Sequence, residues 1–144
     1  MDSHLSAGAA DTERIAGALA RHLRPGDVVL IGGELGAGKT TFVRGACRAL
    51  GVREPVVSPT FTIGRRYRAS GGLVVAHLDL YRLETLDGED PGLIDDYLTP
   101  DAVAFVEWPE VAGAELVEPA ARVSIEHAGG DRRRLRIARA GEPQ

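Results

Sequence analysis

Residues 33–41 read Gly33-Glu34-Leu35-Gly36-Ala37-Gly38-Lys39-Thr40-Thr41. The pattern G-x-x-x-x-G-K-T is that of a phosphate-binding loop, which lies between a strand and a helix. An apolar, β-branched run at residues 28–31 precedes the loop and predicts a buried parallel strand. Residues 41–50 follow it and carry apolar side chains at mostly helical spacing. The stretch therefore predicts an α/β fold built around a phosphate site.

Each part of the loop has a chemical reason. Its glycines allow the backbone to curl around an anion, and the amides of the loop and of the helix N-terminus then point at phosphate. Lys39, the only lysine of the chain, supplies a positive charge to the β and γ phosphates, and the Thr40 hydroxyl is a ligand for Mg²⁺. The alternative is a glycine-rich turn before an ordinary helix, which the strand and helix on either side disfavour.

The composition is that of one globular domain. The chain has 144 residues and a formal net charge of -4, which disfavours nonspecific binding to a polyanion. No apolar run approaches the roughly 20 residues that span a membrane, and no signal peptide opens the chain. We expect a cytoplasmic protein without a membrane partner. We also expect a flexible N-terminal tail at residues 1–10, an ATPase domain at 11–140 and a C-terminal tail at 141–144.

Two carboxylates stand at the ends of predicted strands. Asp79 follows the hydrophobic run 73–78, and Glu107 follows the run 101–106. In open α/β sheets the carboxyl ends of the strands face the ligand. A phosphate-loop hydrolase needs one carboxylate to hold the metal and a group to position the attacking water, and the residues alone do not say which acid has which task. His77 is interpreted as a structural histidine on the strand face opposite Asp79.

The sequence leaves two interpretations open for residues 58–62 and two for Thr12. Ser58-Pro59-Thr60-Phe61-Thr62 is either a switch whose hydroxyls sense the γ-phosphate or its metal, or a turn at a strand edge. Thr12 lies where the first helix is expected to begin, at residues 11–13, and is either a helix cap or a contact to the nucleotide base.

The remaining pattern predicts mostly strands. Residues 61–67 and 73–78 read as one hairpin, and 122–126 and 133–137 as another. Residues 83–100 are acidic and contain apolar positions that predict a short helix.

The residue inventory narrows the nucleotide. The chain contains no asparagine, so the Asn-Lys-x-Asp element by which GTPases read guanine cannot exist, and ATP is favoured. A small-molecule or nucleoside kinase is the alternative enzyme class. Such an enzyme usually needs a mobile, arginine-bearing lid, for which Arg65 to Arg68 is a poor candidate.

Taken together, four motifs make the chain resemble the TsaE (YjeE) family. They are Gly-Glu-Leu-Gly-Ala-Gly-Lys-Thr-Thr at 33–41, Ser-Pro-Thr-Phe-Thr at 58–62, His-Leu-Asp-Leu-Tyr-Arg at 77–82 and Val-Glu-Trp-Pro-Glu at 106–110. The first motif is shared by many families, whereas the other three together are specific to this one. The resemblance covers roughly residues 12–110 and implies a single-domain P-loop NTPase with a mixed, partly antiparallel sheet.

For the site, the resemblance implies specific roles. Thr40 and Glu107 would hold magnesium, and Asp79 would lie near the γ-phosphate and take part in hydrolysis with Lys39. Trp108 would lie beside the site.

The resemblance also bears on three further candidates for the site. Ser58 to Phe61 would form a switch-like segment. The N-terminal segment and the run 132–134 match the family weakly, so Thr12 as a base contact and Arg133 as a nucleotide contact are secondary candidates.

The resemblance also implies an activity and partners. The family is the bacterial ATPase of tRNA threonylcarbamoyladenosine synthesis, with weak, Mg²⁺-dependent hydrolysis of ATP. Its partner is the TsaB–TsaD heterodimer, and its ATP cycle resets that transferase between turnovers. We expect tRNA to be met only within the complex. A second possibility is a binding module, in which ATP fixes a conformation and turnover is secondary.

Overall fold

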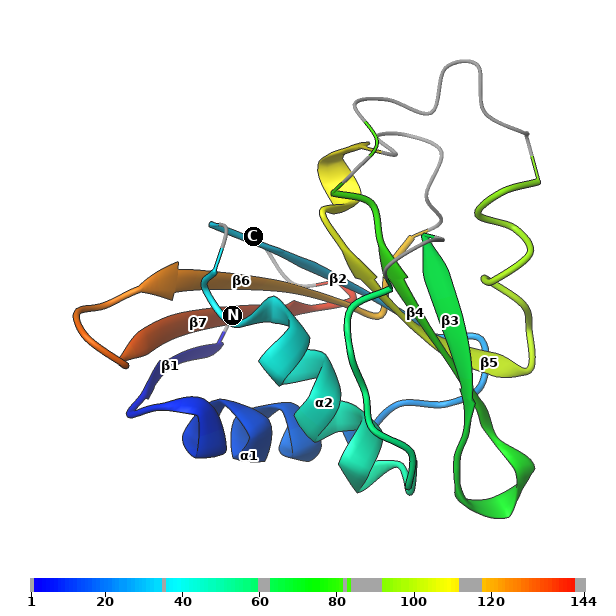
Figure 1. Cartoon of the computed structure of the whole chain (residues 1–144), viewed down its shortest axis with the longest axis horizontal. Coiled ribbons are helices and arrows are strands. Elements are labelled where there is room, and N and C mark those ends of the chain that lie inside the picture. Colours follow the sequence, from blue (N-terminus) through cyan, green and yellow to red (C-terminus); the bar gives the residue numbers. More distant parts are fainter. Residues whose placement is uncertain are drawn as a thin grey trace.

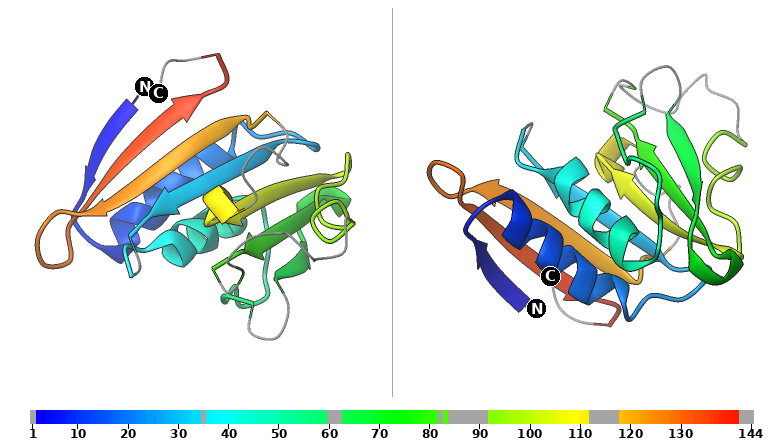
Figure 2. Two further views of the ribbon diagram at one scale, coloured as in Figure 1. Left: turned by 90° about the horizontal axis from the view of Figure 1, so that it is seen from above. Right: turned by 60° about the horizontal axis from the view of Figure 1, so that its bottom comes forward.

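A computed structural model describes residues 2–34, 36–59, 63–81, 83, 92–111 and 118–141. Within this part of the chain the strands form one sheet of seven, in the order β1-β7-β6-β2-β5-β4-β3. Helices α1 and α2 lie side by side on one face of the sheet (Figure 1). The further views show α1 along the β6–β7 half of the sheet and α2 nearer to β2 (Figure 2).

The elements have the following bounds. The strands are β1 (Asp2–Ser6), β2 (Val28–Gly33), β3 (Gly64–Arg68), β4 (Val74–Asp79), β5 (Ala102–Glu107), β6 (Ala121–His127) and β7 (Arg133–Arg139). The helices are α1 (Ala9–Ala20) and α2 (Lys39–Ala49), with short 3-10 turns η1 (Ser70–Gly72) and η2 (Pro109–Val111).

The centre of the sheet is parallel and its edges are antiparallel. Strand β2 pairs in parallel with both β5 and β6, and β5 pairs in parallel with β4. The pairs β3–β4, β6–β7 and β1–β7 are antiparallel. Every residue of β5 is buried, as expected for a parallel strand that is covered on both faces. The prediction of a mixed, partly antiparallel α/β sheet is confirmed.

Alternation along β2 divides the core between the two sheet faces. Val29 and Ile31 pack with the helices, in a cluster that includes Phe42 of α2. Val28 and Leu30 belong to a second cluster on the other face. Because both faces carry a core, the start of the glycine-rich loop after β2 is held from both sides.

Helices α1 and α2 approach each other closely because each has a glycine at their contact. A Cβ added at Gly45 would lie 2.4 Å from the Cα of Glu13, whereas one added at Gly17 would lie 3.4 Å from the Cβ of Ala49. Only a residue without a side chain fits at Gly45, so α1 fixes the position of α2, the helix that carries the end of the loop.

Both predicted hairpins are confirmed. Strand β3 pairs with β4 and β6 pairs with β7, both antiparallel. Residues 61 and 62, which were included in the first predicted arm, lie outside the described residues.

The prediction of a flexible tail at residues 1–10 is wrong. Residues 2–6 form β1, which pairs with residues 133–137 of β7, and α1 begins at Ala9. Only Ser6 of this strand is buried, so its side chains show no core pattern. The backbone pairing with β7 decides the structure instead.

The predicted short helix at residues 83–100 is not found in its described portion. Residues 92–97 form turns, while 84–91 lie outside the described residues. Ile94 packs against the second core cluster, so its apolar side chain is used without a regular helix.

In the described part of the chain, no helix is long and apolar enough to cross a membrane.

Candidate functional site

The glycine-rich loop joins β2 to α2 in a conformation that depends on glycine. Gly33 has φ 141, and a Cβ there would lie 2.2 Å from the carbonyl oxygen of Ile125. Gly38, the residue before α2, has a left-handed backbone with φ 104. Helix α2 then starts at Lys39, so its free backbone amides open onto the loop. Leu35 lies outside the described residues.

Lys39 is the cation of the site. Its ammonium group donates to the carbonyl oxygens of Gly33 and Glu34, at 2.9 and 2.8 Å. It also lies 4.1 Å from the centre of the Trp108 ring, a distance typical of a cation–π contact. Burial lowers the pKa of Lys39, against the opposing effect of nearby carboxylates, chiefly Glu107. An ammonium group has three donors, so the carbonyl contacts leave one for another acceptor.

Glu107 is the centre of a chain of hydrogen bonds. The Thr40 hydroxyl donates to Glu107 Oε2 at 3.0 Å and lies 2.7 Å from the Ser58 hydroxyl. His77 Nε2 lies 2.5 Å from the same carboxylate oxygen. Since Thr40 donates to Glu107, Ser58 is the donor to Thr40. The chain therefore runs from Ser58 through Thr40 to Glu107, with His77 at the other end.

Asp79 stands next to Glu107 because their strands are parallel neighbours in register. The backbone N–H of Tyr81 donates to Asp79 Oδ1 at 3.0 Å. Burial raises the pKa of Asp79, and the charge of Glu107 adds to the effect; the N–H of Tyr81 acts against it, with weaker contributions from His77 and Lys39. The two strand-end acids are therefore in one site, as the sequence predicts.

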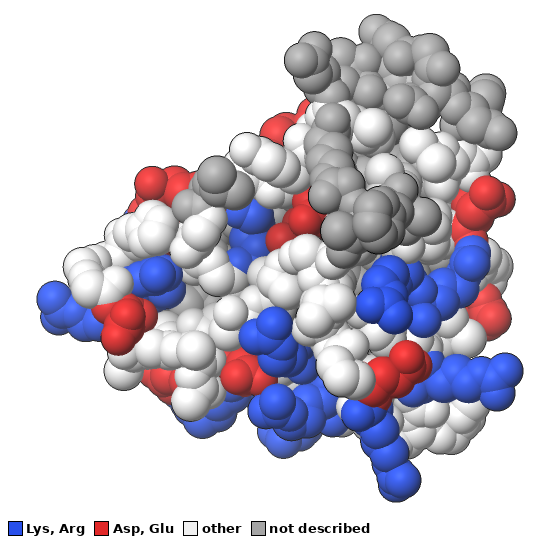
Figure 3. Space-filling view, viewed as in Figure 1, with Lys and Arg blue, Asp and Glu red and all other residues white. Residues whose placement is uncertain are grey.

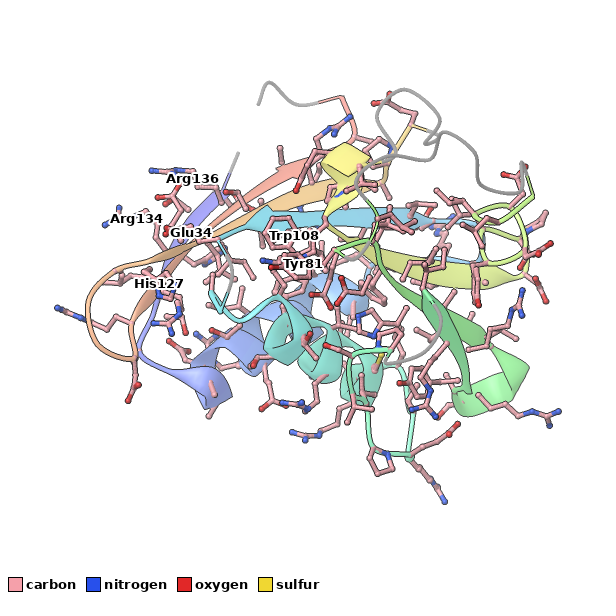
Figure 4. All side chains as sticks on the ribbon, turned by 45° about the horizontal axis from the view of Figure 1, so that its top comes forward. Glu34, Tyr81, Trp108, His127, Arg134 and Arg136 are labelled. Carbon is pink, nitrogen blue, oxygen red and sulfur yellow. The ribbon has the colours of Figure 1, made fainter. Side chains whose placement is uncertain are left out.

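Trp108 turns the chain into the site. It has a positive φ of 58, which is uncommon for a bulky residue, and its N–H bonds to the carbonyl of Ile31 at 3.3 Å. Its ring lies 5.0 Å from that of Tyr81, tilted by 44°. Figure 4 shows these two aromatic side chains next to each other beside the glycine-rich loop. With this backbone conformation the indole ring lies over the ammonium group of Lys39.

A cavity of about 330 Å³ lies between these groups. It is lined by Gly36, Gly38, Lys39, Thr40, Thr41, Ser58, Asp79, Tyr81, Glu107 and Trp108. Figure 3 shows a hollow near the middle of this face in which basic and acidic side chains lie together. Among its described lining residues there is no arginine, and the described chain holds no group of three His, Cys, Asp or Glu side chains placed to bind a metal alone.

A second cavity, of about 370 Å³, adjoins the other side of the loop. It is lined by Ala7, Gly8, Ala9, Thr12, Gly36, Gly38, Thr41, Asp131 and Arg133. The Arg133 Nε–H donates to the carbonyl of Ala37 at 3.0 Å, which joins the hairpin β6–β7 to the loop. Both cavities are lined by Gly36, Gly38 and Thr41, so they adjoin the same part of the loop.

The cap interpretation of Thr12 is wrong. Gly8 precedes the helix, and Thr12 lies inside α1 with its hydroxyl 2.7 Å from that of Ser6. Thr12 is nevertheless brought to the second cavity, beside Arg133.

Most of the predicted site residues come together, and some cannot be placed. Thr60 and Phe61 of the switch-like segment lie outside the described residues, Ser58 reaches Thr40, and Pro59 is buried. The predicted face of His77 is wrong. Positions two apart on a strand share a face, so His77 points to the same side as Asp79, where it contacts Glu107.

Sequence reasoning also missed Tyr81. It lies outside the strand pattern, and only its place two residues after Asp79 could have indicated its position in the cavity.

Comparison with known proteins identifies the family. The model of the TsaE family, described as threonylcarbamoyl adenosine biosynthesis protein TsaE, matches residues 6–135. The chain is 40% identical over 131 residues to the tRNA threonylcarbamoyladenosine biosynthesis protein TsaE of Bacillus subtilis, covering 91% of this chain and 81% of that protein. It is 34% identical over 134 residues to the protein of the same name from Treponema pallidum, covering 93% and 98%.

The fold has a solved counterpart. The crystal structure of Bacillus subtilis YdiB superposes with a TM-score of 0.79 at 32% sequence identity, covering 97% of this chain and 86% of that one.

Proposed function

Because the chain belongs to the TsaE family, we propose that it is the ATP-binding and slowly ATP-hydrolysing component of the machinery that makes threonylcarbamoyladenosine in tRNA. The relatives are named for this biosynthesis. The proposal assigns the loop at residues 33–41 as a phosphate-binding loop and the protein as a P-loop ATPase.

The geometry of the loop supports phosphate binding. The left-handed Gly38 and the start of α2 at Lys39 direct backbone amides toward one place, which is how helix N-termini bind anions. The Lys39 ammonium is already in the loop, held by two carbonyls. In the proposed complex it exchanges part of this contact for the β and γ phosphates of ATP.

The donor set between Thr40 and Glu107 fits magnesium. Mg²⁺ prefers oxygen ligands and is usually held by one or two carboxylates together with substrate phosphates and water. A hydroxyl and a carboxylate that line the same cavity offer that chemistry. We assign Thr40 and Glu107 as the residues that hold the metal, which would neutralise charge on the phosphates when bound.

Asp79 is the candidate that acts on water. It stands at the cavity beside Glu107, and its raised pKa makes it a better proton acceptor than an ordinary carboxylate. In the proposed step, Asp79 takes a proton from water as the water oxygen bonds to the γ-phosphorus. The bond from that phosphorus to the β,γ-bridging oxygen breaks, with its electron pair leaving on ADP. Lys39 stabilises the charge on the phosphates.

The second cavity suits the rest of the nucleotide. It adjoins the loop at Gly36 and Gly38, and its polar lining consists of Thr12 of α1, Thr41 of α2, and Asp131 and Arg133 of the hairpin β6–β7. We propose that the nucleoside end of ATP lies there, with Arg133 connecting it to the loop through Ala37.

We propose that catalysis is completed by a partner, the TsaB–TsaD heterodimer. The described lining of the first cavity lacks an arginine, and a missing arginine finger can lower the rate on the order of a thousandfold or more. Ser58 bonds to Thr40, so residues 58–61 could report the state of the nucleotide to that partner. tRNA is met within the complex, and the cytoplasm, where ATP and tRNA are found, is the expected location.

The juxtaposition of Thr40 and Glu107 at the cavity carries the proposal, and phosphate release from ATP and Mg²⁺ tests it. We expect slow release by the protein alone, faster release with the TsaB–TsaD pair of its host, and loss of both in Glu107→Ala and Asp79→Ala. The exposed Glu118→Ala is the matched control and keeps both rates. If the Glu107→Ala protein hydrolyses ATP at the normal rate, the assignment of Glu107 to the magnesium site is wrong. Phosphate transfer to an acceptor in place of water would instead indicate a small-molecule or nucleoside kinase.

A further inference from the structure

A histidine lies beneath the carboxylate of the proposed magnesium site. His77 is fully buried in β4, and Glu107 is 2% exposed at the end of β5. His77 is in register with Phe105, two residues before Glu107, so the side chains of His77 and Glu107 point to the same face of the sheet. His77 Nε2 approaches Glu107 Oε2 to 2.5 Å. A carboxylate only accepts hydrogen bonds, so Nε2 carries the proton and donates it.

Burying this imidazole has a cost that packing does not explain. The other ring nitrogen, Nδ1, is buried and has no hydrogen-bond partner in the described structure. A buried polar atom without a partner loses its hydrogen bonds to water and gains none in return. An apolar side chain would fill a fully buried position in β4 without that cost. The histidine is therefore better explained by what Nε2 does for Glu107.

The hydrogen bonds distinguish the two oxygens of the carboxylate. His77 and Thr40 both contact Oε2. No hydrogen bond to Oε1 is found from the described residues, and Glu107 lines the cavity. With Oε2 held by two donors from different elements, rotation of the carboxylate is restricted, and Oε1 stays available to a metal ion or to one of its waters.

We propose that His77 is a positioning residue that sets the orientation of Glu107 for magnesium. This inference rests on the proposed function, because it needs the metal site at Thr40 and Glu107. The Nε2–H group holds one carboxylate oxygen so that the ligand is arranged before the metal arrives. Residues that orient metal ligands in this way typically change metal affinity by about 10-fold to 100-fold when they are replaced.

The test compares two variants in the full chain. His77→Leu removes the donor and keeps the bulk, whereas His77→Gln keeps an N–H donor at a similar reach. Mg²⁺ is titrated into protein saturated with ADP, and binding is followed through Trp108, the only tryptophan, which lines the cavity. ADP affinity in EDTA is measured separately. We expect His77→Leu to bind Mg²⁺ about 10-fold to 100-fold more weakly, with unchanged ADP affinity in EDTA, and His77→Gln to recover most of the loss.

Each other outcome counts against the role of His77. Equal Mg²⁺ affinity in His77→Leu and the parent overturns it, and so does a His77→Gln variant as weak as His77→Leu. If circular dichroism shows that His77→Leu is unfolded, His77→Gln is compared with His77→Asn. Asn is equally polar but shorter by one carbon, so equal Mg²⁺ affinity of the two overturns the inference. If Mg²⁺ does not bind to the parent protein, the proposed metal site itself is wrong. The experiment therefore distinguishes failure of the metal site from failure of the positioning role of His77.

Discussion

At the scale of single residues, the site combines groups that stability alone would not select. Lys39 is buried, Asp79 is held where its charge is disfavoured, and Trp108 has a positive φ. Functional sites commonly hold such locally unfavourable arrangements, which the surrounding fold has to support. Here the support is the central parallel strands, whose ends carry Asp79 and Glu107.

Asp79→Asn should stabilise the protein while it removes activity. Burial raises the pKa of Asp79, so the folded protein binds this proton more tightly than the unfolded chain does. The free energy of unfolding therefore falls as the pH rises from 3.8, the ordinary pKa of the carboxyl group, to the raised pKa of the folded protein. At higher pH the full loss of stability remains. We expect a higher melting temperature for Asp79→Asn at neutral pH, and a gain that shrinks toward the ordinary carboxyl pKa. ATP hydrolysis should fall by about 100-fold or more.

Thermal melts across the pH range and phosphate release measure the two effects. Asp95 is exposed, so Asp95→Asn is the control and should change neither the melting temperature nor the rate of phosphate release. A lower melting temperature for Asp79→Asn at neutral pH would contradict the assigned environment of this residue.

Cys47 should be inert in the native protein. It is fully buried on α2, and burial raises the pKa of its thiol to about 12. Since the thiolate is the reactive form, iodoacetamide at mildly alkaline pH should modify one thiol per chain only after unfolding. Mass spectrometry with and without denaturant measures this, and labelling of the native protein at the unfolded rate would disprove the burial.

At the scale of elements, the contact between α1 and α2 controls where the loop ends. The helices are in close contact at Gly45, where the backbone of Glu13 occupies the space of a side chain. Because α2 begins at Lys39, a displacement at Gly45 is transmitted along about 1.7 turns of helix to the site.

Gly45→Ala should therefore destabilise the protein although alanine favours helices. Its Cβ would lie 2.4 Å from Glu13 Cα, and overpacking of this kind costs about 1–3 kcal/mol. Gly17→Ala is the matched control on the facing helix, where the Cβ would meet Ala49 at 3.4 Å. Alanine has a higher helix propensity than glycine, by up to about 1 kcal/mol. The Gly17→Ala protein should therefore be as stable as the parent or more stable. Urea unfolding ranks the variants, and a Gly45→Ala protein as stable as Gly17→Ala would show that the helices can separate freely.

Sequence reasoning succeeded where one short segment determines its own structure. The loop at residues 33–41 has its own glycines and its own flanking strand and helix, so its place could be predicted. It failed where the partner is distant. Strand β1 has one buried side chain and exists because β7 offers an unpaired edge. The contact of Arg133 with Ala37 likewise needs a hairpin folded back on the loop, which no local pattern encodes.

At the scale of the whole molecule, β1 closes one side of the sheet. It pairs with residues 133–137 along β7, and Ser6 at its end reaches Thr12 at the second cavity. An unpaired β7 would present free backbone groups to other chains.

Removing residues 1–6 should weaken the fold and promote association. The lost backbone hydrogen bonds, at about 1 kcal/mol each, should lower the free energy of unfolding by roughly 1–3 kcal/mol. Light scattering should show more aggregation on heating. Leu5→Ser is the control, because Leu5 is 56% exposed and the variant keeps the strand. Unchanged stability and solubility of the shortened chain would show that β1 adds nothing.

The position of β2 also determines when the site can form during synthesis. Strand β2 leaves the ribosome early, yet both of its neighbours in the sheet come from residues 102–107 and 121–127. Gly33 is held against Ile125, so a nascent chain that has passed the loop still lacks the walls of the proposed nucleotide site. Such distant pairings make folding slow. Under the proposed function, nucleotide can therefore stabilise only a chain in which residues 121–127 have already been made, and products that stop before them lack these walls.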